Sequence, residues 1–224
     1  MKASVSLWSA DQLDLGGAVD ALDGRVDGFH MDVMDGHFVP ELLFGVDAVR
    51  AVSARARFSP VDVHLMVTDA DAWIEPFAVA GADMLTVHPQ SCPDVGATLR
   101  SIEERNVQPA VALTLDMAVE TVVPLLECVD RVLLMGTAIG IKGVELSDEA
   151  VPRIRRLVKL CDASDRRPEI YADGAIRAHT VPELARAGAD GVVPGSLVFG
   201  QADWLGAVQF IHDQPVDERT VGSR

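Results

Sequence analysis

The sequence predicts an α/β fold, a (β/α)₈ barrel with eight parallel strands inside and eight helices outside. Short apolar runs alternate strictly with amphipathic stretches, which is typical of a parallel sheet. The length of 224 residues suits one closed barrel. Hydrophobic residues make up 49% of the chain and aromatic residues only 5%, and aliphatic side chains fit parallel strands that are buried on both faces.

The expected strands are short apolar runs bounded by polar or turn residues. In chain order they are Ala3–Leu7, Gly28–Val33, Val61–Met66, Met84–His88, Pro109–Leu113, Arg131–Met135, Glu169–Ala172 and Gly191–Pro194. The stretches between them have helical spacing of apolar residues. They are Ala10–Leu22, Val46–Ala54, Ala70–Ala80, Val95–Arg105, Ala118–Leu126, Asp148–Leu160, Ala178–Ala187 and Trp204–His212. An open doubly wound sheet is the alternative, but the glycine-rich turn that it usually has after its first strand is absent here.

Two joints between a helix and the next strand share the pattern A-G-A-D, at residues 80–83 and 187–190. A glycine at the end of a helix permits the left-handed conformation that caps it. We therefore interpret the pattern as a repeated structural joint. Residues 1–213 are expected to form one catalytic barrel domain, and residues 214–224, which are polar without apolar periodicity, a loose tail.

The formal net charge is −15, from 34 acidic and 19 basic residues. Such a surface disfavours nucleic acid and anionic membranes as partners, and an anionic substrate would need local basic groups. The three cysteines show no CxxC spacing, which indicates a reducing compartment. We expect no signal peptide and no membrane-spanning stretch, and therefore a cytoplasmic protein.

Metal-capable residues lie where several predicted strands end, which is where barrels carry their active sites. His30 and Asp32 share one face of the second strand because side chains alternate along a strand. His64 on the third strand and Asp173 after the seventh are expected to point into the same mouth, and His88 ends the fourth. Two imidazoles and two carboxylates suit Zn²⁺, Fe²⁺, Mn²⁺ or Co²⁺. Taken singly, each histidine could instead be a hydrogen-bonded core residue, and an Asp-Gly pair could be a simple turn.

The residues that carry this pattern resemble a known family. Residues 30–40, HMDVMDGHFVP, resemble the signature H-x-D-x-M-D-G-x-F-V-P of ribulose-phosphate 3-epimerases. Residues 62–67, DVHLMV, resemble the family's D-x-H-L-M-V, and residues 6–11, SLWSAD, are similar to its S-I-L-S-A-D. The resemblance covers about residues 2–212. It implies a TIM barrel of the ribulose-phosphate-binding type.

The resemblance also implies a function and a site. The function would be that of an isomerase of pentose phosphate metabolism, a metal-dependent epimerase that inverts C3 of a phosphorylated ketose such as D-ribulose 5-phosphate or D-xylulose 5-phosphate. One divalent metal ion would be bound by His30, Asp32, His64 and Asp173, with Asp32 and Asp173 as the two acid–base groups. A homo-oligomer is implied as well. The residues lining the reaction centre would be Ser6, Met34, Met66 and Met135.

The sequence departs from the family after the sixth strand. The family has M-T-V-N-P-G-F-G-G-Q, whereas residues 135–144 read MGTAIGIKGV, so that Gly140 and Gly143 are kept and Lys142 replaces a glycine. Lys142 could bind the substrate's phosphate, or the loop could be rebuilt for a different ketose phosphate. Ala175 also replaces a family glycine. The residues that still fit the usual phosphate corner are Gly174, Gly195 and Ser196.

Two other classes remain as alternatives. A Schiff-base aldolase needs a buried lysine, but the chain has only Lys2, Lys142 and Lys159, and none is placed inside the expected barrel. The D-x-K-x-x-D motif of related barrel decarboxylases is absent. A non-catalytic barrel that binds sugar phosphates is the second alternative, although all four expected metal positions are present.

Overall fold

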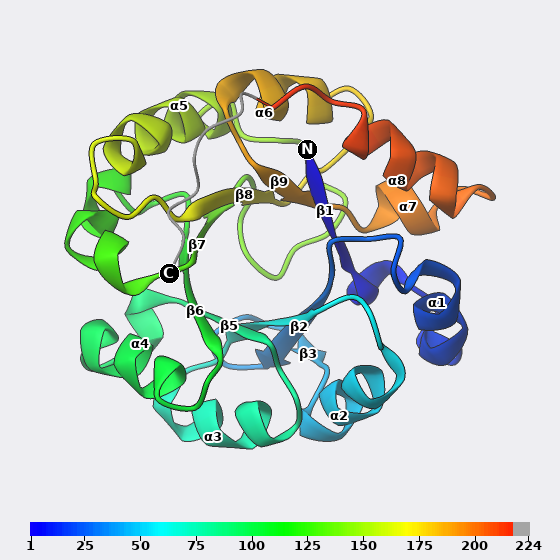
Figure 1. The fold of residues 1–224 in the computed structure, drawn as a ribbon, viewed down its shortest axis with the longest axis horizontal. Coiled ribbons are helices and arrows are strands. Elements are labelled where there is room, and N and C mark those ends of the chain that lie inside the picture. The colour runs from blue at the N-terminus through cyan, green and yellow to red at the C-terminus, as the bar shows by residue number, and fades with distance from the viewer. Residues whose placement is uncertain (217–224) are drawn as a thin grey trace.

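The computed structural model describes residues 1–216, and in it eight parallel strands form a closed barrel (Figure 1). Around the barrel the order is β1-β9-β8-β7-β6-β5-β4-β2, and β1 also pairs with β2. This last pairing closes the sheet, which confirms the barrel and excludes the open alternative. The strands are β1 (Lys2–Ser6), β2 (Gly28–Asp35), β4 (Val61–Met66), β5 (Met84–Val87), β6 (Gln108–Leu113), β7 (Arg131–Met135), β8 (Glu169–Asp173) and β9 (Gly191–Val193).

The α-helices surround this barrel in Figure 1. They are α1 (Leu15–Leu22), α2 (Val46–Arg55), α3 (Asp71–Val79), α4 (Val95–Glu103), α5 (Ala150–Cys161), α6 (Val181–Ala187), α7 (Ser196–Phe199) and α8 (Trp204–His212). Three 3₁₀ helices and one short strand complete the fold: η1 (Leu7–Ser9), η2 (Pro89–Ser91), η3 (Val119–Cys128) and β3 (Leu42–Leu43), which is antiparallel to β2.

The expected helix Ala178–Ala187 begins three residues later, at Val181. Two other expected helices differ more from the structure. The first begins at Leu15 rather than Ala10, because η1 precedes it and the Asp14 carboxylate caps the helix by accepting a hydrogen bond from Gly17 N. The stretch predicted as an α-helix from Ala118 is the 3₁₀ helix η3, with Pro124 inside it. Proline has no N–H to donate, so Pro124 removes one backbone hydrogen bond from this stretch.

The two A-G-A-D joints have the predicted conformation. Gly81 and Gly188 have φ values of 96° and 100°, and Gly188 is the residue that caps α6. A residue with a Cβ would be strained in this left-handed region. Each glycine thus allows the chain to turn directly from a helix into the following strand.

Strand residues alternate between the helices and the barrel interior. Outward-facing residues such as Val5, Met31 and Leu65 are fully buried in one apolar cluster with the helices. The inward-facing positions are more polar and include His30 and His64, which are also fully buried. The apolar layer therefore supplies the packing, and the interior is left to carry chemistry.

The register of the parallel pairs sets which inward residues lie side by side. His30 is paired with Asp62 and Asp32 with His64 across β2 and β4. Ser6 on β1 is paired with His30. These pairs place the polar residues of three strands at matching heights near the carboxyl ends.

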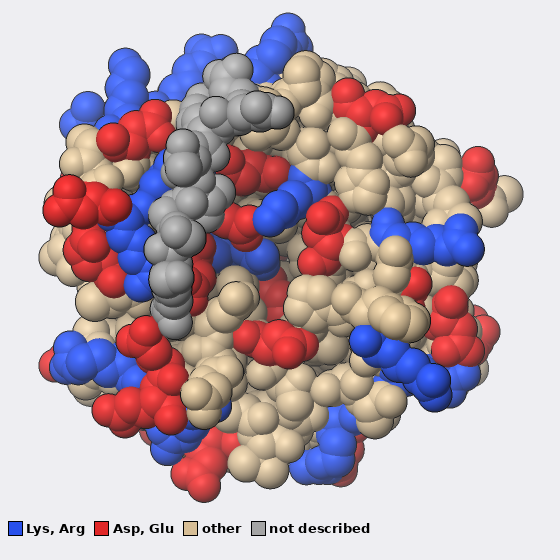
Figure 2. Space-filling model, in the orientation of Figure 1, with Lys and Arg blue, Asp and Glu red and all other residues tan. Residues whose placement is uncertain are grey.

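Acidic and basic side chains are mixed over the face seen in Figure 2, with charged groups also at its centre. No helix within residues 1–216 is long and apolar enough to cross a membrane. Helix α8 ends at His212, and most of the predicted tail, residues 217–224, lies outside the described residues.

Candidate active site

The structure brings together the four residues singled out as metal ligands. His30 and Asp32 come from β2, His64 from β4 and Asp173 from the end of β8, and one ligand atom of each lies within 4.8 Å of the others. Asp32 Oδ1 is 3.3 Å from His30 Nε2 and 3.4 Å from His64 Nδ1. His64 Nδ1 is 4.0 Å from Asp173 Oδ2. All four groups therefore face one point in the barrel's mouth.

Among residues 1–216, the two imidazole nitrogens that face this point find no hydrogen-bond partner. His30 Nε2 and His64 Nδ1 are buried, although buried polar atoms are almost always hydrogen-bonded. A cation between these nitrogens and the carboxylates of Asp32 and Asp173 would satisfy both. The donor set of two nitrogens and two carboxylates is one that binds divalent metals. The residues present therefore fit a divalent metal site.

The other ring nitrogen of each of these two histidines contacts a buried side chain on the side away from the four-residue cluster. His30 Nδ1 is 3.0 Å from Asp62 Oδ2, and His64 Nε2 is 2.8 Å from His88 Nε2. Burial holds the pKa of His88 well below its usual value, so its ring is neutral and can accept the hydrogen bond from His64. The sequence placed His88 among metal-capable residues, but in the structure it lies behind a ligand-type residue. Such partners orient metal-binding imidazoles.

The carboxyl groups of Asp32 and Asp173 differ in proton affinity. Burial would raise the pKa of Asp32, but the His30 and His64 imidazoles outweigh it and hold that pKa well below its usual value. Burial and the charge of Asp32 raise the pKa of Asp173 to about 6. Ser6 Oγ also donates a hydrogen bond of 2.8 Å to Asp32 Oδ2. A divalent cation would lower the pKa of Asp173 again by its positive charge.

A cavity of about 330 Å³ opens above these groups, and Asp32 and Asp173 form part of its wall. Met34 is not among the lining residues; it is buried against Val39 and Met66. The other residues predicted to bind substrate all line the cavity: Ser6, Met66, Met135, Gly140, Lys142, Gly143, Gly174, Gly195 and Ser196.

Two basic side chains reach this cavity. The Lys142 ammonium donates a 2.9 Å hydrogen bond to the Trp8 carbonyl and lies 4.2 Å from the centre of the Trp8 ring. Arg177 Nη1 donates a 2.8 Å hydrogen bond to Ser196 Oγ. Sequence reasoning missed Arg177, although a basic residue four positions after Asp173 was a usable signal. Both charges are local exceptions to the acidic composition of the chain.

The backbone explains why Ala175 is an unusual residue at its position. Its φ is 52°, and the preceding Gly174 has a φ of 93°. The left-handed region costs roughly 1–2 kcal/mol for a residue with a Cβ. The departure noted in the sequence thus puts strain into the loop that follows β8.

The fold and the site together define a class of protein. It is a (β/α)₈ barrel with a histidine–carboxylate centre at the carboxyl ends of its strands, beside a cavity with basic side chains. Residues 2–199 match the ribulose-phosphate 3 epimerase family. The chain is 37% identical to the ribulose-phosphate 3-epimerase of Bacillus subtilis, over 94% of this chain and 98% of that protein. It is also 37% identical to the ribulose-phosphate 3-epimerase of Rhodobacter capsulatus, over 89% of this chain and 86% of that protein. The chain belongs to the ribulose-phosphate 3-epimerase family.

Solved structures of other proteins share the fold. KGPDC from Streptococcus mutans superposes with a TM-score of 0.73 at 15% identity, covering 95% of this chain and 96% of that one. The 3-hexulose-6-phosphate synthase of Salmonella typhimurium gives 0.66 at 22% identity, covering 94% and 96%. These similarities support the barrel architecture alone.

Ala175→Gly is expected to raise the free energy of unfolding by about 0.5–1 kcal/mol. The strain relieved is roughly 1–2 kcal/mol, and glycine loses only roughly 0.5–1 kcal/mol through its greater freedom in the unfolded chain. Urea unfolding measures the change. Ala138→Gly is the control, because Ala138 is exposed in a loop without a positive φ and should lose stability. A urea midpoint lower for Ala175→Gly than for the wild type would show that Ala175 is not strained.

Proposed function

We propose that this protein is an isomerase that interconverts D-ribulose 5-phosphate and D-xylulose 5-phosphate by inverting C3. The observation that carries the proposal is the convergence of the Asp32 and Asp173 carboxylates on two unpartnered imidazole nitrogens beside the cavity. Membership in the ribulose-phosphate 3-epimerase family supports the same reaction. No redox cofactor is required, because the reaction only moves a proton.

The reaction needs two proton-transfer groups on opposite sides of the sugar. Asp32 lies on β2 and Asp173 on β8, and β1 and β9 separate these strands in the barrel. In one direction, one carboxylate takes the proton from C3, and the C–H electron pair delocalises onto the neighbouring carbonyl oxygen. The other carboxyl group then gives its proton to the opposite face of C3, so that the configuration inverts. Each such group typically contributes about 10²–10⁴-fold to the rate.

The residues expected to hold one divalent metal ion are His30, Asp32, His64 and Asp173. When bound, the metal would act as a Lewis acid for the negative charge that develops on the substrate's oxygens. The ligand chemistry is compatible with Zn²⁺, Fe²⁺, Mn²⁺ or Co²⁺. Ser6 holds Asp32 Oδ2 by a hydrogen bond and thereby orients this carboxylate.

The phosphate end of the substrate is proposed to bind at the basic side of the cavity. Arg177 and Ser196 are hydrogen-bonded to each other there, beside Gly174 and Gly195. Lys142 reaches the same cavity from the loop after β7. A guanidinium and an ammonium provide charge-assisted hydrogen bonds to phosphate. They would also offset the repulsion expected from a chain with a net charge of −15.

The sequence leaves two alternative functions: an epimerase that acts on a different ketose phosphate, and a non-catalytic barrel that binds sugar phosphates. The rebuilt loop around Lys142 supports the first, since it lines the cavity. An aldolase is not favoured, because Lys2 is ion-paired with Glu169 and Lys142 bonds to the Trp8 carbonyl. A cytoplasmic location and a homo-oligomeric state stay predictions.

Proton NMR in D₂O tests the reaction. With D-ribulose 5-phosphate, we expect deuterium to enter C3 as D-xylulose 5-phosphate appears. Asp173→Asn should slow deuterium incorporation and the formation of D-xylulose 5-phosphate by about 10²–10⁴-fold, because one of the two acid–base groups is lost. Asp148→Asn, at an exposed carboxylate in the loop after β7, is the control and should behave like the wild type. Deuterium uptake with another ketose phosphate alone would point to the rebuilt-loop alternative, and no uptake with any would support the non-catalytic barrel.

Removal of the metal is expected to abolish turnover. Protein stripped with a chelator and dialysed should recover activity when one equivalent of Co²⁺, Mn²⁺, Fe²⁺ or Zn²⁺ is added. Metal binding should also raise the melting temperature, since a ligand that binds only the folded state stabilises it. Full activity of metal-free protein would contradict the metal site.

Lys142→Ala is expected to raise KM by about 10–150-fold with little change in kcat. A charge-assisted hydrogen bond contributes about 1.5–3 kcal/mol, and this one would act on the bound phosphate throughout the reaction. Steady-state kinetics measure both constants. Lys159→Ala removes the same charge from an exposed position on α5 and should leave KM unchanged. An unchanged KM in Lys142→Ala would show that this lysine is a solvated loop residue.

A further inference from the structure

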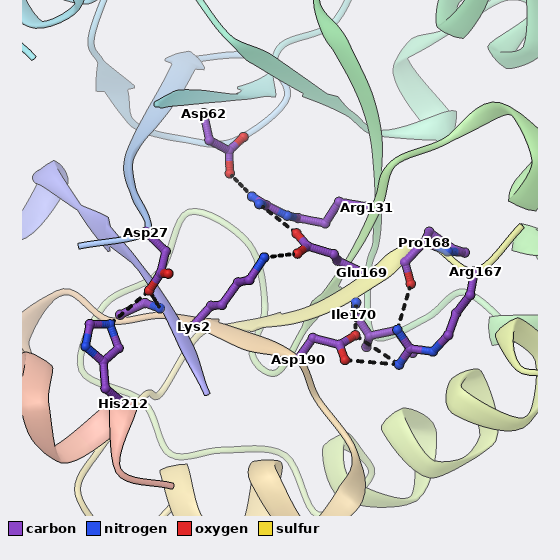
Figure 3. A network of polar contacts seen from close by, with 11 residues as sticks. Lys2, Asp27, Asp62, Arg131, Arg167, Pro168, Glu169, Ile170, Asp190 and His212 are labelled. Carbon is purple, nitrogen blue, oxygen red and sulfur yellow. Dashed lines mark hydrogen bonds and ion pairs between the residues drawn. The ribbon is translucent and has the colours of Figure 1, made fainter. Parts of the chain in front are cut away.

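Four charged side chains, of Asp62, Arg131, Glu169 and Lys2, form a line across the barrel interior (Figure 3). It begins at Asp62, whose Oδ2 is 2.9 Å from Arg131 Nη1. Arg131 Nη2 is 3.2 Å from Glu169 Oε2, and Glu169 is ion-paired with Lys2. The line joins the neighbouring strands β7 and β8 to β4 and β1, neither of which is adjacent to them in the barrel.

Asp62 connects this line to the proposed metal site. The same Oδ2 that accepts a hydrogen bond from Arg131 is 3.0 Å from His30 Nδ1. Asp62 Oδ1 accepts a 3.1 Å hydrogen bond from Thr86. With both oxygens engaged, the carboxylate cannot turn, and it remains the acceptor for a proton on His30 Nδ1. His30 Nε2 then carries a lone pair toward the other ligands.

Stability alone does not account for Arg131. Its side chain is only 10% exposed, and no residue among 1–216 accepts a hydrogen bond from its Nε, which adds to the cost of burying the charge. Its guanidinium lies 3.8 Å from the centre of the Tyr171 ring. Replacing a whole buried group of charges by apolar residues is often neutral or stabilising, so this group of charges calls for a reason beyond stability.

We propose that Arg131 is a positioning residue of the metal site, which acts through Asp62 to hold His30 in the orientation and tautomer that bind the metal. The inference rests on the metal site of the proposed function. Arg131 offers a rigid set of donors, so it holds the Asp62 carboxylate directed at His30. A carboxylate without this partner could rotate and release the imidazole.

Arg167 provides a matched control. It too is a buried arginine, 6% exposed, and its Nη2 lies 3.1 and 3.0 Å from the two carboxylate oxygens of Asp190 (Figure 3). Asp190 accepts a hydrogen bond from Ile170 N and contacts no residue of the metal site. Arg167→Met and Arg131→Met therefore both remove a buried ion pair, but only the second affects His30.

Co²⁺ binding to the chelator-stripped protein tests the proposal. Arg131→Met is expected to weaken Co²⁺ binding about 10–100-fold in a chelator-competition titration, because Asp62 would no longer be held as the outer partner of His30 and losing such a partner usually costs this much. Arg167→Met should stay within about twofold of the wild type. The melting temperature of each metal-free variant reports the separate effect on stability. Equal Co²⁺ affinity in Arg131→Met and the wild type would overturn the proposal.

A double variant separates positioning from general damage to the fold. Asp62→Asn should itself weaken Co²⁺ binding, and adding Arg131→Met to it should cause little further loss, because Arg131 acts through Asp62. If the two substitutions weaken Co²⁺ binding independently, so that their fold-losses multiply in the double variant, Arg131 does not act through Asp62. If Arg131→Met does not fold, Arg131→Lys takes its place in the Co²⁺ titration. It keeps the charge but loses the fixed donor geometry, so we expect Co²⁺ affinity to fall by about threefold to tenfold. Unchanged Co²⁺ affinity in Arg131→Lys would overturn the proposal.

Failure of this inference differs from failure of the proposed function. Wild-type protein that binds no Co²⁺ would remove the metal site and the function built on it. Wild-type protein that binds Co²⁺, with the affinity unchanged in Arg131→Met, would leave the function intact and remove Arg131 alone.

Discussion

The parallel pairing of β2 with β4 is the constraint on which the site depends. It sets His30 beside Asp62 and Asp32 beside His64, so that an imidazole and a carboxylate alternate across the two strands. A slip of one residue would turn each of these side chains from the interior toward the helices. The apolar residues between them, which pack against the helices, prevent such a slip because it would place them in the polar interior.

Charge in the barrel interior has to be compensated locally, because buried ions are costly without partners. The structure meets this need in two layers. Below the site, the Asp62 and Glu169 carboxylates are ion-paired with Arg131 and Lys2, and at the mouth Asp32 and Asp173 face two imidazole nitrogens without a hydrogen-bond partner among residues 1–216. The lower carboxylates are thus paired with cationic protein groups, whereas the upper layer leaves two nitrogens unpaired. The lower charges therefore hold the site in place, whereas the groups at the mouth form a site that fits a cation.

Much of the fold follows from local patterns. Apolar runs determined the eight strands to within about two residues, and the glycines at positions 81 and 188 adopt the left-handed conformation expected of the repeated joints. The helices were less well predicted. Asp14 begins α1 later than the periodicity indicated, because capping there outweighs apolar spacing. The stretch that contains Pro124 is a 3₁₀ rather than an α-helix, which apolar spacing does not distinguish.

The sequence by itself determined the barrel, the family resemblance and the four residues that meet in the mouth, since strand alternation decides which side chains face inward. It could not show that His88 and Met34 lie away from the cavity, or that Arg177 lines it. Nor could it pair Arg131 with Asp62, which is 69 positions away in the chain. That contact forms across the barrel between β7 and β4, which are not neighbouring strands, and only closure of the sheet brings the two side chains together.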